Sequence, residues 1–210
     1  MVIKEKNVLD DIKAAVAAGL REEAGEMTGS AVKAGSRAED IRDAILEGLN
    51  LMRRGLMSRS ASIPEFLLCV DAASDGLAKL SEERVEMGKA YPTIVIGVVE
   101  GDPHEMGKAI IAGIYRAFGF RVIDLGVQVP EEDFVKGVLQ NKADILAVSA
   151  MMSTTMVQMP GIISAVRQKS PQTLIMVGGA PLDRKLAEEY GADGYAESAV
   201  TVLEETQAVL

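Results

Sequence analysis

The spacing of apolar residues changes near Pro92, and this change divides the chain into two parts. From Val8 to Leu80 apolar residues recur every three or four positions, which is the period of helices packed on one another. After Pro92, short β-branched runs alternate with longer amphipathic segments, a pattern that favours a parallel sheet covered by helices on both faces. The stretch 84–92 has neither rhythm, so we expect a helical domain over residues 1–88 and an α/β domain over residues 89–210.

The first part predicts a bundle of four helices, of which the one near residues 22–34 has the weakest apolar pattern. Ser36 precedes Glu39, and Ser62 precedes Glu65, at the spacing of a capping box. In that motif, the two side chains satisfy the unpaired amide groups at the start of a helix. We therefore expect helices to begin near Ser36 and near Ser62.

The second part predicts five parallel strands separated by helices. The expected strands are 93–99, 121–125, 144–149, 173–177 and 194–196, and the expected helices are 106–118, 131–140, 157–169, 182–190 and 199–209. In open sheets of this kind, ligands bind beyond the carboxyl ends of the strands. The loops that follow the strands are therefore where a site is expected.

Composition excludes several classes of function. A formal net charge of -9 opposes a surface that neutralises nucleic-acid phosphates. Cys69 is the single cysteine, so neither an intrachain disulfide nor a cysteine-rich zinc site can form, and a reducing compartment is favoured. No apolar run approaches the ~20 residues that a bilayer requires. We expect a cytoplasmic protein that binds no nucleic acid and no membrane.

The loop after the first expected strand carries His104, the only histidine of the chain. A lone histidine is more often a capping or surface residue than a ligand. Asp102, however, lies two residues earlier, and a metal-bound imidazole usually donates its other N–H to such a carboxylate. Gly107 permits close approach of a bulky ligand to the next helix. A metal-ligating role for His104 is thus weighed against a structural one.

Two further loops have both a functional and a structural interpretation. Ser149 ends the third strand and is followed by Ser153, Thr154 and Thr155, hydroxyl residues that suit either a ligand or a helix cap. Gly178-Gly179 ends the fourth strand and permits either close backbone approach to a ligand or a tight turn. Taken alone, neither loop decides between the two.

Together the three loops resemble the cobalamin-binding domain of methionine synthase, methylmalonyl-CoA mutase and the corrinoid proteins of methyltransferase systems. The family pattern is D-x-H-x-x-G, then S-x-L, then G-G. This chain has Asp102, His104 and Gly107, then Ser149-Ala150-Met151, then Gly178-Gly179. The helical part is similar to the four-helix domain that precedes the cobalamin domain in methyl-carrying corrinoid proteins. The resemblance implies a Rossmann-like, flavodoxin-like α/β domain after that bundle.

The resemblance also implies a role for each loop residue. His104 becomes the lower axial ligand of cobalt in place of the benzimidazole tail, which is the base-off/His-on state. Asp102 holds the imidazole, and Thr155 hydrogen-bonds Asp102. The residues expected at the cofactor and along its tail are Gly101, Asp102, Pro103, His104, Gly107, Ser149, Met151, Ser153, Gly178, Gly179 and, at the far end, Ala199. Departures from the pattern are Pro103, Met151 in place of leucine, and the basic residues Arg53, Arg54 and Arg59, whose role is open.

The implied function is to carry a methyl group on cobalt. The chain would accept it from a substrate-specific methyltransferase and pass it to a second methyltransferase that acts on tetrahydrofolate or a thiol, with a reductive activase as a further partner. It would be a cofactor-carrying subunit and not a complete enzyme. The alternatives are a cobalamin-responsive sensor or regulator and the small subunit of an adenosylcobalamin mutase. The methyl donor and acceptor, the native corrinoid and the oligomeric state stay unassigned.

Overall fold

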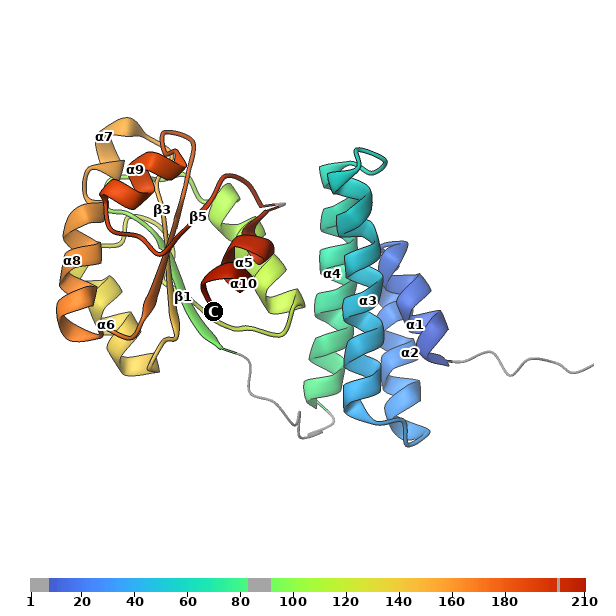
Figure 1. The fold of residues 1–210 in the computed structure, drawn as a ribbon. Helices are drawn as coiled ribbons and strands as arrows, with labels where there is room; N and C mark the ends of the chain where they lie inside the picture. The colour runs from blue at the N-terminus through green and yellow to red at the C-terminus, as the bar shows by residue number, and fades with distance from the viewer. Residues whose placement is uncertain (1–7, 83–91, 200) are drawn as a thin grey trace, which may run out of the picture. The chain divides into compact units, whose positions relative to one another are not determined.

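The computed structural model describes residues 8–82, 92–199 and 201–210, which form two compact units (Figure 1). One unit is helical and the other is α/β. The expected domain boundary near residue 88 lies outside the described residues.

The helical unit has four helices, which confirms the prediction of a four-helix part. They are α1 (Val8–Ala17), α2 (Arg21–Lys33), α3 (Ala38–Met57) and α4 (Ile63–Glu82). The buried residues of α2 are small: Ala24, Gly25, Thr28 and Ala31. A β-carbon at Gly25 would collide with the carboxylate of Asp75 on α4, so α2 packs close to α4. Small side chains explain why α2 has the weakest apolar pattern of the four.

The two expected capping boxes have different outcomes. At α4, the backbone N–H of Ser62 donates to Glu65 Oε2 at 2.7 Å and the backbone N–H of Glu65 donates to Ser62 Oγ at 3.4 Å, the reciprocal pair of a capping box. At α3 the prediction is wrong, because the cap position is Arg37 and it makes no side-chain cap bond. Ser36 lies one residue too early, and the guanidinium of Arg37 instead pairs with Asp40 at 2.6 Å.

The α/β unit contains a parallel five-stranded sheet in the order β2-β1-β3-β4-β5, as predicted for a flavodoxin-like domain. The strands are β1 (Thr93–Val98), β2 (Arg121–Asp124), β3 (Ile145–Ser149), β4 (Leu174–Gly178) and β5 (Gly194–Ala196). The helices are α5 (Met106–Ala117), α6 (Glu131–Asn141), α7 (Ser153–Met156), α8 (Met159–Lys169), α9 (Arg184–Glu189) and α10 (Val202–Val209). α6 and α8 cover one face of the sheet, and α5 and α10 cover the other (Figure 1).

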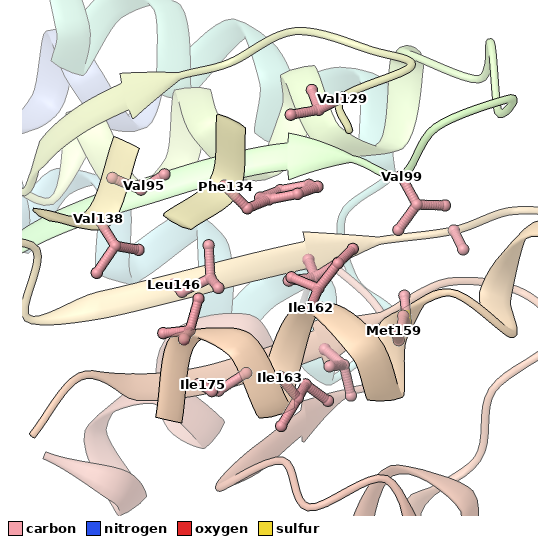
Figure 2. Close-up of a cluster of buried hydrophobic side chains, with 14 of the residues drawn as sticks. Val95, Val99, Val129, Phe134, Val138, Leu146, Met159, Ile162, Ile163 and Ile175 are labelled. Atoms are coloured by element: carbon pink, nitrogen blue, oxygen red, sulfur yellow. The ribbon is translucent and has the colours of Figure 1, made fainter. Parts of the chain in front are cut away.

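Alternate residues of each strand serve the two faces. Val95, Leu146 and Ile175 pack with Phe134 of α6 and Ile162 of α8 in one buried cluster (Figure 2). Because successive side chains of a strand point to opposite faces, their neighbours Ile96, Ala147 and Met176 face α5 and α10. The sheet thus separates an apolar core from the side on which the site described below is found.

The strand order reverses between β1 and β3, and the strand ends are level at that point. Val98 pairs with Ser149, Ser149 with Gly178, and Gly178 with Ala196. The chain leaves β1 and β3 toward opposite edges of the sheet, which opens a crevice between the two loops. Among the described residues, no helix is long and apolar enough to cross a membrane.

Candidate functional site

The loop after β1 turns sharply and buries one carboxylate. Gly101 has φ +75°, a backbone conformation that glycine adopts without strain, and the amide of Asp102 bonds back to the carbonyl of Val99 at 3.2 Å. The turn directs Asp102 under the loop after β3, where its side chain is fully buried. A buried carboxylate needs partners for its oxygens.

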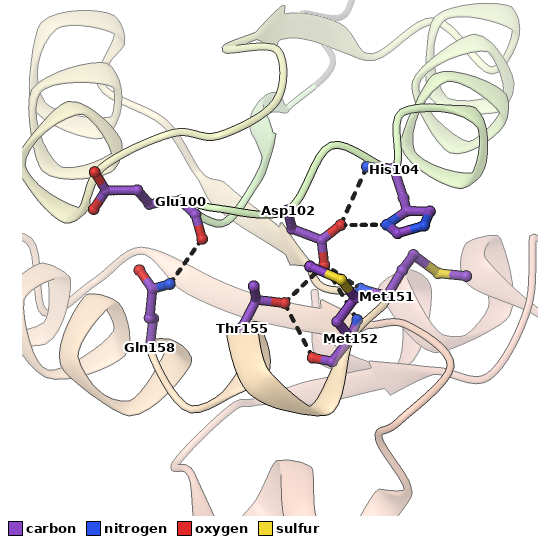
Figure 3. Close-up of polar contacts among 7 residues, drawn as sticks. All are labelled: Glu100, Asp102, His104, Met151, Met152, Thr155 and Gln158. Atoms are coloured by element: carbon purple, nitrogen blue, oxygen red, sulfur yellow. Dashed lines mark hydrogen bonds and ion pairs between the residues drawn. The ribbon is translucent and has the colours of Figure 1, made fainter.

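Five donors surround the carboxylate of Asp102 (Figure 3). Oδ1 lies 3.1 Å from the backbone nitrogen of His104 and 2.7 Å from its Nδ1. Oδ2 accepts hydrogen bonds from the backbone N–H groups of Met151 at 2.7 Å and Met152 at 3.2 Å, and lies 2.8 Å from the hydroxyl of Thr155. Asp102 therefore ties the β1 loop to the β3 loop and to the first turn after it.

These hydrogen bonds keep Asp102 ionised. Burial by itself raises the pKa of the carboxyl group, but the bonds from Met151, His104 and Thr155 outweigh burial and hold that pKa well below its usual range. An ionised carboxylate is only an acceptor, so Nδ1 of His104 must carry the proton that it shares with Oδ1. In the neutral ring, Nε2 is then left with a lone pair.

The imidazole of His104 is accessible although its partner is not. Its side chain is 52% exposed, against 0% for Asp102. The ring is thus held at Nδ1 and offers Nε2 to a ligand from the solvent side. Within the described part of the chain, no group of three or more His, Cys, Asp or Glu side chains is arranged to hold a metal ion.

Thr155 is the second residue behind the imidazole. Its hydroxyl lies 2.8 Å from Asp102 Oδ2 and 3.0 Å from the carbonyl of Met152. A hydroxyl has one proton to donate, and the ionised carboxylate is the stronger acceptor. The structure thus brings His104, Asp102 and Thr155 into one hydrogen-bonded chain that runs from the exposed ring to a buried side chain.

A cavity of about 260 Å³ lies beside the hydrogen-bonded residues His104, Asp102 and Thr155, on the side of the sheet that faces α5 and α10. Six of the expected cofactor residues line it: Gly107, Ser149, Met151, Gly178, Gly179 and Ala199. Ser153, which was expected in the pocket, lies outside its wall instead, because it is the exposed first residue of α7. Gly101 and Pro103 shape the loop that carries His104 and also lie outside the cavity wall.

Glycine occupies positions 179 and 107 of the cavity wall for different physical reasons. Gly179 has φ +137°, and a β-carbon there would collide with the carbonyl oxygen of Ala150, so no other residue fits. Gly107 meets no such limit, because a β-carbon there would have no atom within 4 Å. The glycine at 107 therefore leaves open space at the wall of the cavity, on the first turn of α5.

Sequence reasoning missed much of the cavity wall, including Lys108, Tyr115 and the strand residues Ile96, Ala147 and Met176. Two signals were available. Gly107, Ile111 and Tyr115 recur every four residues, which places them on one face of α5. Ala147 lies two residues before Ser149 and so points to the same face of the sheet, and its neighbours across the sheet, Ile96 and Met176, point there too. Lys108 is buried with its ammonium 2.6 and 2.7 Å from the two carboxylate oxygens of Asp124, a pairing that no local pattern indicates.

Comparison with known proteins agrees with this geometry. The B12 binding domain family matches residues 92–204. Trimethylamine corrinoid protein 1 of Methanosarcina acetivorans is 34% identical over 100% of this chain and 97% of its own length. A chain of the methanol:cobalamin methyltransferase complex of Methanosarcina barkeri superposes with a TM-score of 0.87 at 25% identity, over 98% of this chain and 80% of that one. A cobalamin-binding protein from Desulfitobacterium hafniense shares the fold, with a TM-score of 0.78 at 21% identity over 96% of this chain and 98% of that one.

The protein belongs to the B12-binding domain family. Over its whole length it is similar to the corrinoid proteins of methyltransferase systems, which combine this domain with a helical part.

Proposed function

We propose that this chain carries a methyl group on the cobalt of a corrinoid, between a substrate-specific methyltransferase and a second methyltransferase that uses tetrahydrofolate or a thiol. The observation that supports it most strongly is the half-exposed imidazole of His104, held by buried Asp102 beside a cavity at the switch point of the sheet. The full-length similarity to a trimethylamine corrinoid protein supports the same function. The sensor and mutase alternatives have no comparable support.

The residues present fit a cobalamin with its tail detached from cobalt. His104 would hold the cobalt of the corrinoid through Nε2, because Asp102 holds its ring at Nδ1 and the ring is half-exposed. The adjacent cavity has largely apolar walls and three glycines in its lining, which suits a flat ring and its linker. When bound, the corrinoid supplies the cobalt on which a methyl group is accepted and released.

The residues of the chain orient and tune the ligand. In this proposal Nε2 of His104 binds cobalt, and Asp102 fixes the tautomer and the ring orientation by accepting the Nδ1 proton. Thr155 fixes Asp102 in turn. Gly107, Ser149, Met151, Gly178, Gly179 and Ala199 form the wall beside the tail. The chain would act as a carrier whose partners, including a reductive activase, supply the remaining chemistry.

The partners are proposed from the relatives. One solved relative is part of a methanol:cobalamin methyltransferase complex. A partner of that class, specific for a methylated substrate, is therefore the expected methyl source for this chain. The partner recognises the methyl donor, so the identity of the donor is a property of the partner and not of this chain.

The axial-ligand role can be tested on one residue because the chain has one histidine. Protein grown on nitrogen-15 histidine is loaded with cobalamin and reduced to the cobalt(II) state for electron paramagnetic resonance. If His104 binds cobalt, the nitrogen splitting of the cobalt signal changes from a triplet to a doublet. An unchanged triplet would mean that the cofactor kept its own base, and the axial-ligand proposal would fail.

Two variants complete this experiment. His104→Ala is expected to lose the histidine-bound spectrum and to regain a nitrogen ligand on addition of free imidazole. Lys185→Ala, a change in an 85% exposed side chain on α9, is expected to leave the spectrum as in the parent protein. Loss of the signal in both variants would point to damage of the fold and not to a role of His104.

A further inference from the structure

The inner part of the cavity is lined by apolar side chains of the strands and helices, in addition to the residues of the three loops. The lining residues that are at most 8% exposed include Ile96, Tyr115, Ala147, Met176 and Val202; the others are Val148, Val177, Ala196 and the charged Lys108. The polar side chains Ser149, Glu197 and Ser198 also line the cavity, but they are half-buried or exposed and so lie toward its opening. Lys108 is buried, and its charge is compensated by Asp124 at 2.6 Å.

Tyr115 is the one residue with a hydroxyl group among these buried lining side chains. Its hydroxyl proton is already engaged in a hydrogen bond. The Tyr115 hydroxyl lies 2.7 Å from Thr206 Oγ1, and Thr206 Oγ1 donates to the carbonyl of Val202 at 2.7 Å. Because threonine has one hydroxyl proton, Tyr115 must be the donor in the first bond. The bond also joins α5 to α10, the two helices that wall the cavity.

The Tyr115 hydroxyl keeps its proton. Burial raises the pKa of the phenol to about 12, so the group stays neutral and continues to donate to Thr206. The backbone groups of β1, β3 and β4 next to the cavity are paired in the sheet. A polar group that entered the inner part would therefore find few partners.

We propose that this inner wall selects the lower base of the corrinoid, favouring an alkyl-substituted benzimidazole over an amino-substituted purine, with Tyr115 and Thr206 as specificity-determining residues. The inference rests on the proposed function, because it assumes that the detached tail occupies the cavity. Burying an amino group without a partner is unfavourable, whereas methyl groups on the ring gain from burial among Ile96, Met176 and Val202. Discrimination of about tenfold or more is expected.

The test compares two cobamides that differ in the lower base alone. Apo-protein is titrated with cobalamin, which carries dimethylbenzimidazole, and with the cobamide that carries adenine, and each Kd is read from the absorption change on binding. Cobalamin is expected to bind about tenfold more tightly or better. Equal affinities, or a preference for the adenine form, would overturn the inference.

Thr206→Val provides the sharper variant. It keeps the shape of the side chain and removes the acceptor of the Tyr115 hydroxyl, which is then free to pair with the polar edge of a purine. The ratio of the two Kd values is expected to fall about three- to tenfold from that of the parent protein. The cost of detaching each base from cobalt is the same in both proteins, so the change in the ratio reports on the pocket.

Two controls keep the outcome interpretable. Thr173→Val removes another buried threonine hydroxyl, one bonded to the carbonyl of Ala143 and outside the cavity wall, and should leave the ratio unchanged. Tyr115→Phe removes the hydroxyl itself and should keep the ratio at the parent value or above it. A ratio that is unaffected by Thr206→Val, or reduced by Tyr115→Phe, would contradict the assignment even if one variant folds poorly.

Different results would contradict the corrinoid function and the selection of the lower base. If neither cobamide binds, the corrinoid function is wrong. If both bind equally and the nitrogen-15 doublet is present, the axial ligand stands and the base selection alone is wrong.

Discussion

Asp102 and His104 have separate tasks although they are two residues apart. Asp102 is buried and joins two loops through five donors, whereas His104 is half-exposed and its ring bonds within the described structure to Asp102 alone. A change at His104 should therefore leave the apo fold nearly intact. A change at Asp102 leaves the part-buried N–H groups of Met151 and Met152 and the buried Thr155 hydroxyl without this acceptor, which costs up to about 1–3 kcal/mol for each group. Urea unfolding of His104→Ala and Asp102→Ala compares the two, and equal losses would contradict this division.

Gly107 permits a prediction in which stability and binding move in opposite directions. Gly107→Ala should raise the free energy of unfolding of the apo-protein by about 0.5–1 kcal/mol, because alanine favours a helix and a β-carbon meets no atom within 4 Å. The same methyl group would enter the space assigned to the cofactor, so the Kd for cobalamin should rise. Urea unfolding and cobalamin titration measure the two effects.

Gly29→Ala is the matched control for Gly107→Ala. Gly29 lies inside α2, and a β-carbon added there would likewise have no atom within 4 Å. It should also raise the free energy of unfolding, with no change in cobalamin affinity. If both substitutions leave the Kd unchanged, Gly107 does not contact the cofactor.

At the scale of elements, the starts of α3 and α4 differ in a way that can be measured. Ser62→Ala removes a side-chain bond at a working capping box and should lower the free energy of unfolding by about 1 kcal/mol. Ser36→Ala should change it by less than about 0.5 kcal/mol, because Ser36 lies outside the cap position of α3. Equal losses in the two variants would show that the cap at α4 contributes nothing specific.

The sequence predicted the strands and the helices well because their apolar periods are strong. Each of the five strands ends within a residue of its expected position, as for β3 at Ser149 and β5 at Ala196. The expected helix over 157–169 instead begins at Met159 as α8, where Pro160 occupies the first turn, and the short α7 precedes it. Ser153 lies outside the cavity for this reason, since α7 carries that residue to the surface.

The rest of the site could not be predicted from local pattern. The contact between Asp102 and Met151 spans 49 residues, and the pair of Tyr115 and Thr206 spans 91. Such contacts depend on the strand order, which the loops and the family resemblance implied but the periodicity did not. The three motifs predicted which loops meet, whereas the inner wall of the cavity required the fold.

At the scale of the whole molecule, cofactor binding should increase the stability of the folded protein. A ligand that binds the folded state alone stabilises it by about 2.7 kcal/mol at one hundred times its Kd, so cobalamin should raise the Tm of the protein. Cobinamide, which has the corrin ring but lacks the nucleotide tail, cannot fill the cavity and should raise the Tm less at the same concentration. Equal shifts from the two compounds would place the tail outside the cavity.

The position of Asp102 also bears on how such proteins diverge. Its hydrogen bonds hold the loops after β1 and β3 together whether or not a cofactor is present. A lineage that gave up the cofactor would be under no pressure to keep His104, yet it would still need the aspartate to fold. Descendants of this domain without a corrinoid should therefore retain the aspartate and show free variation at the histidine position.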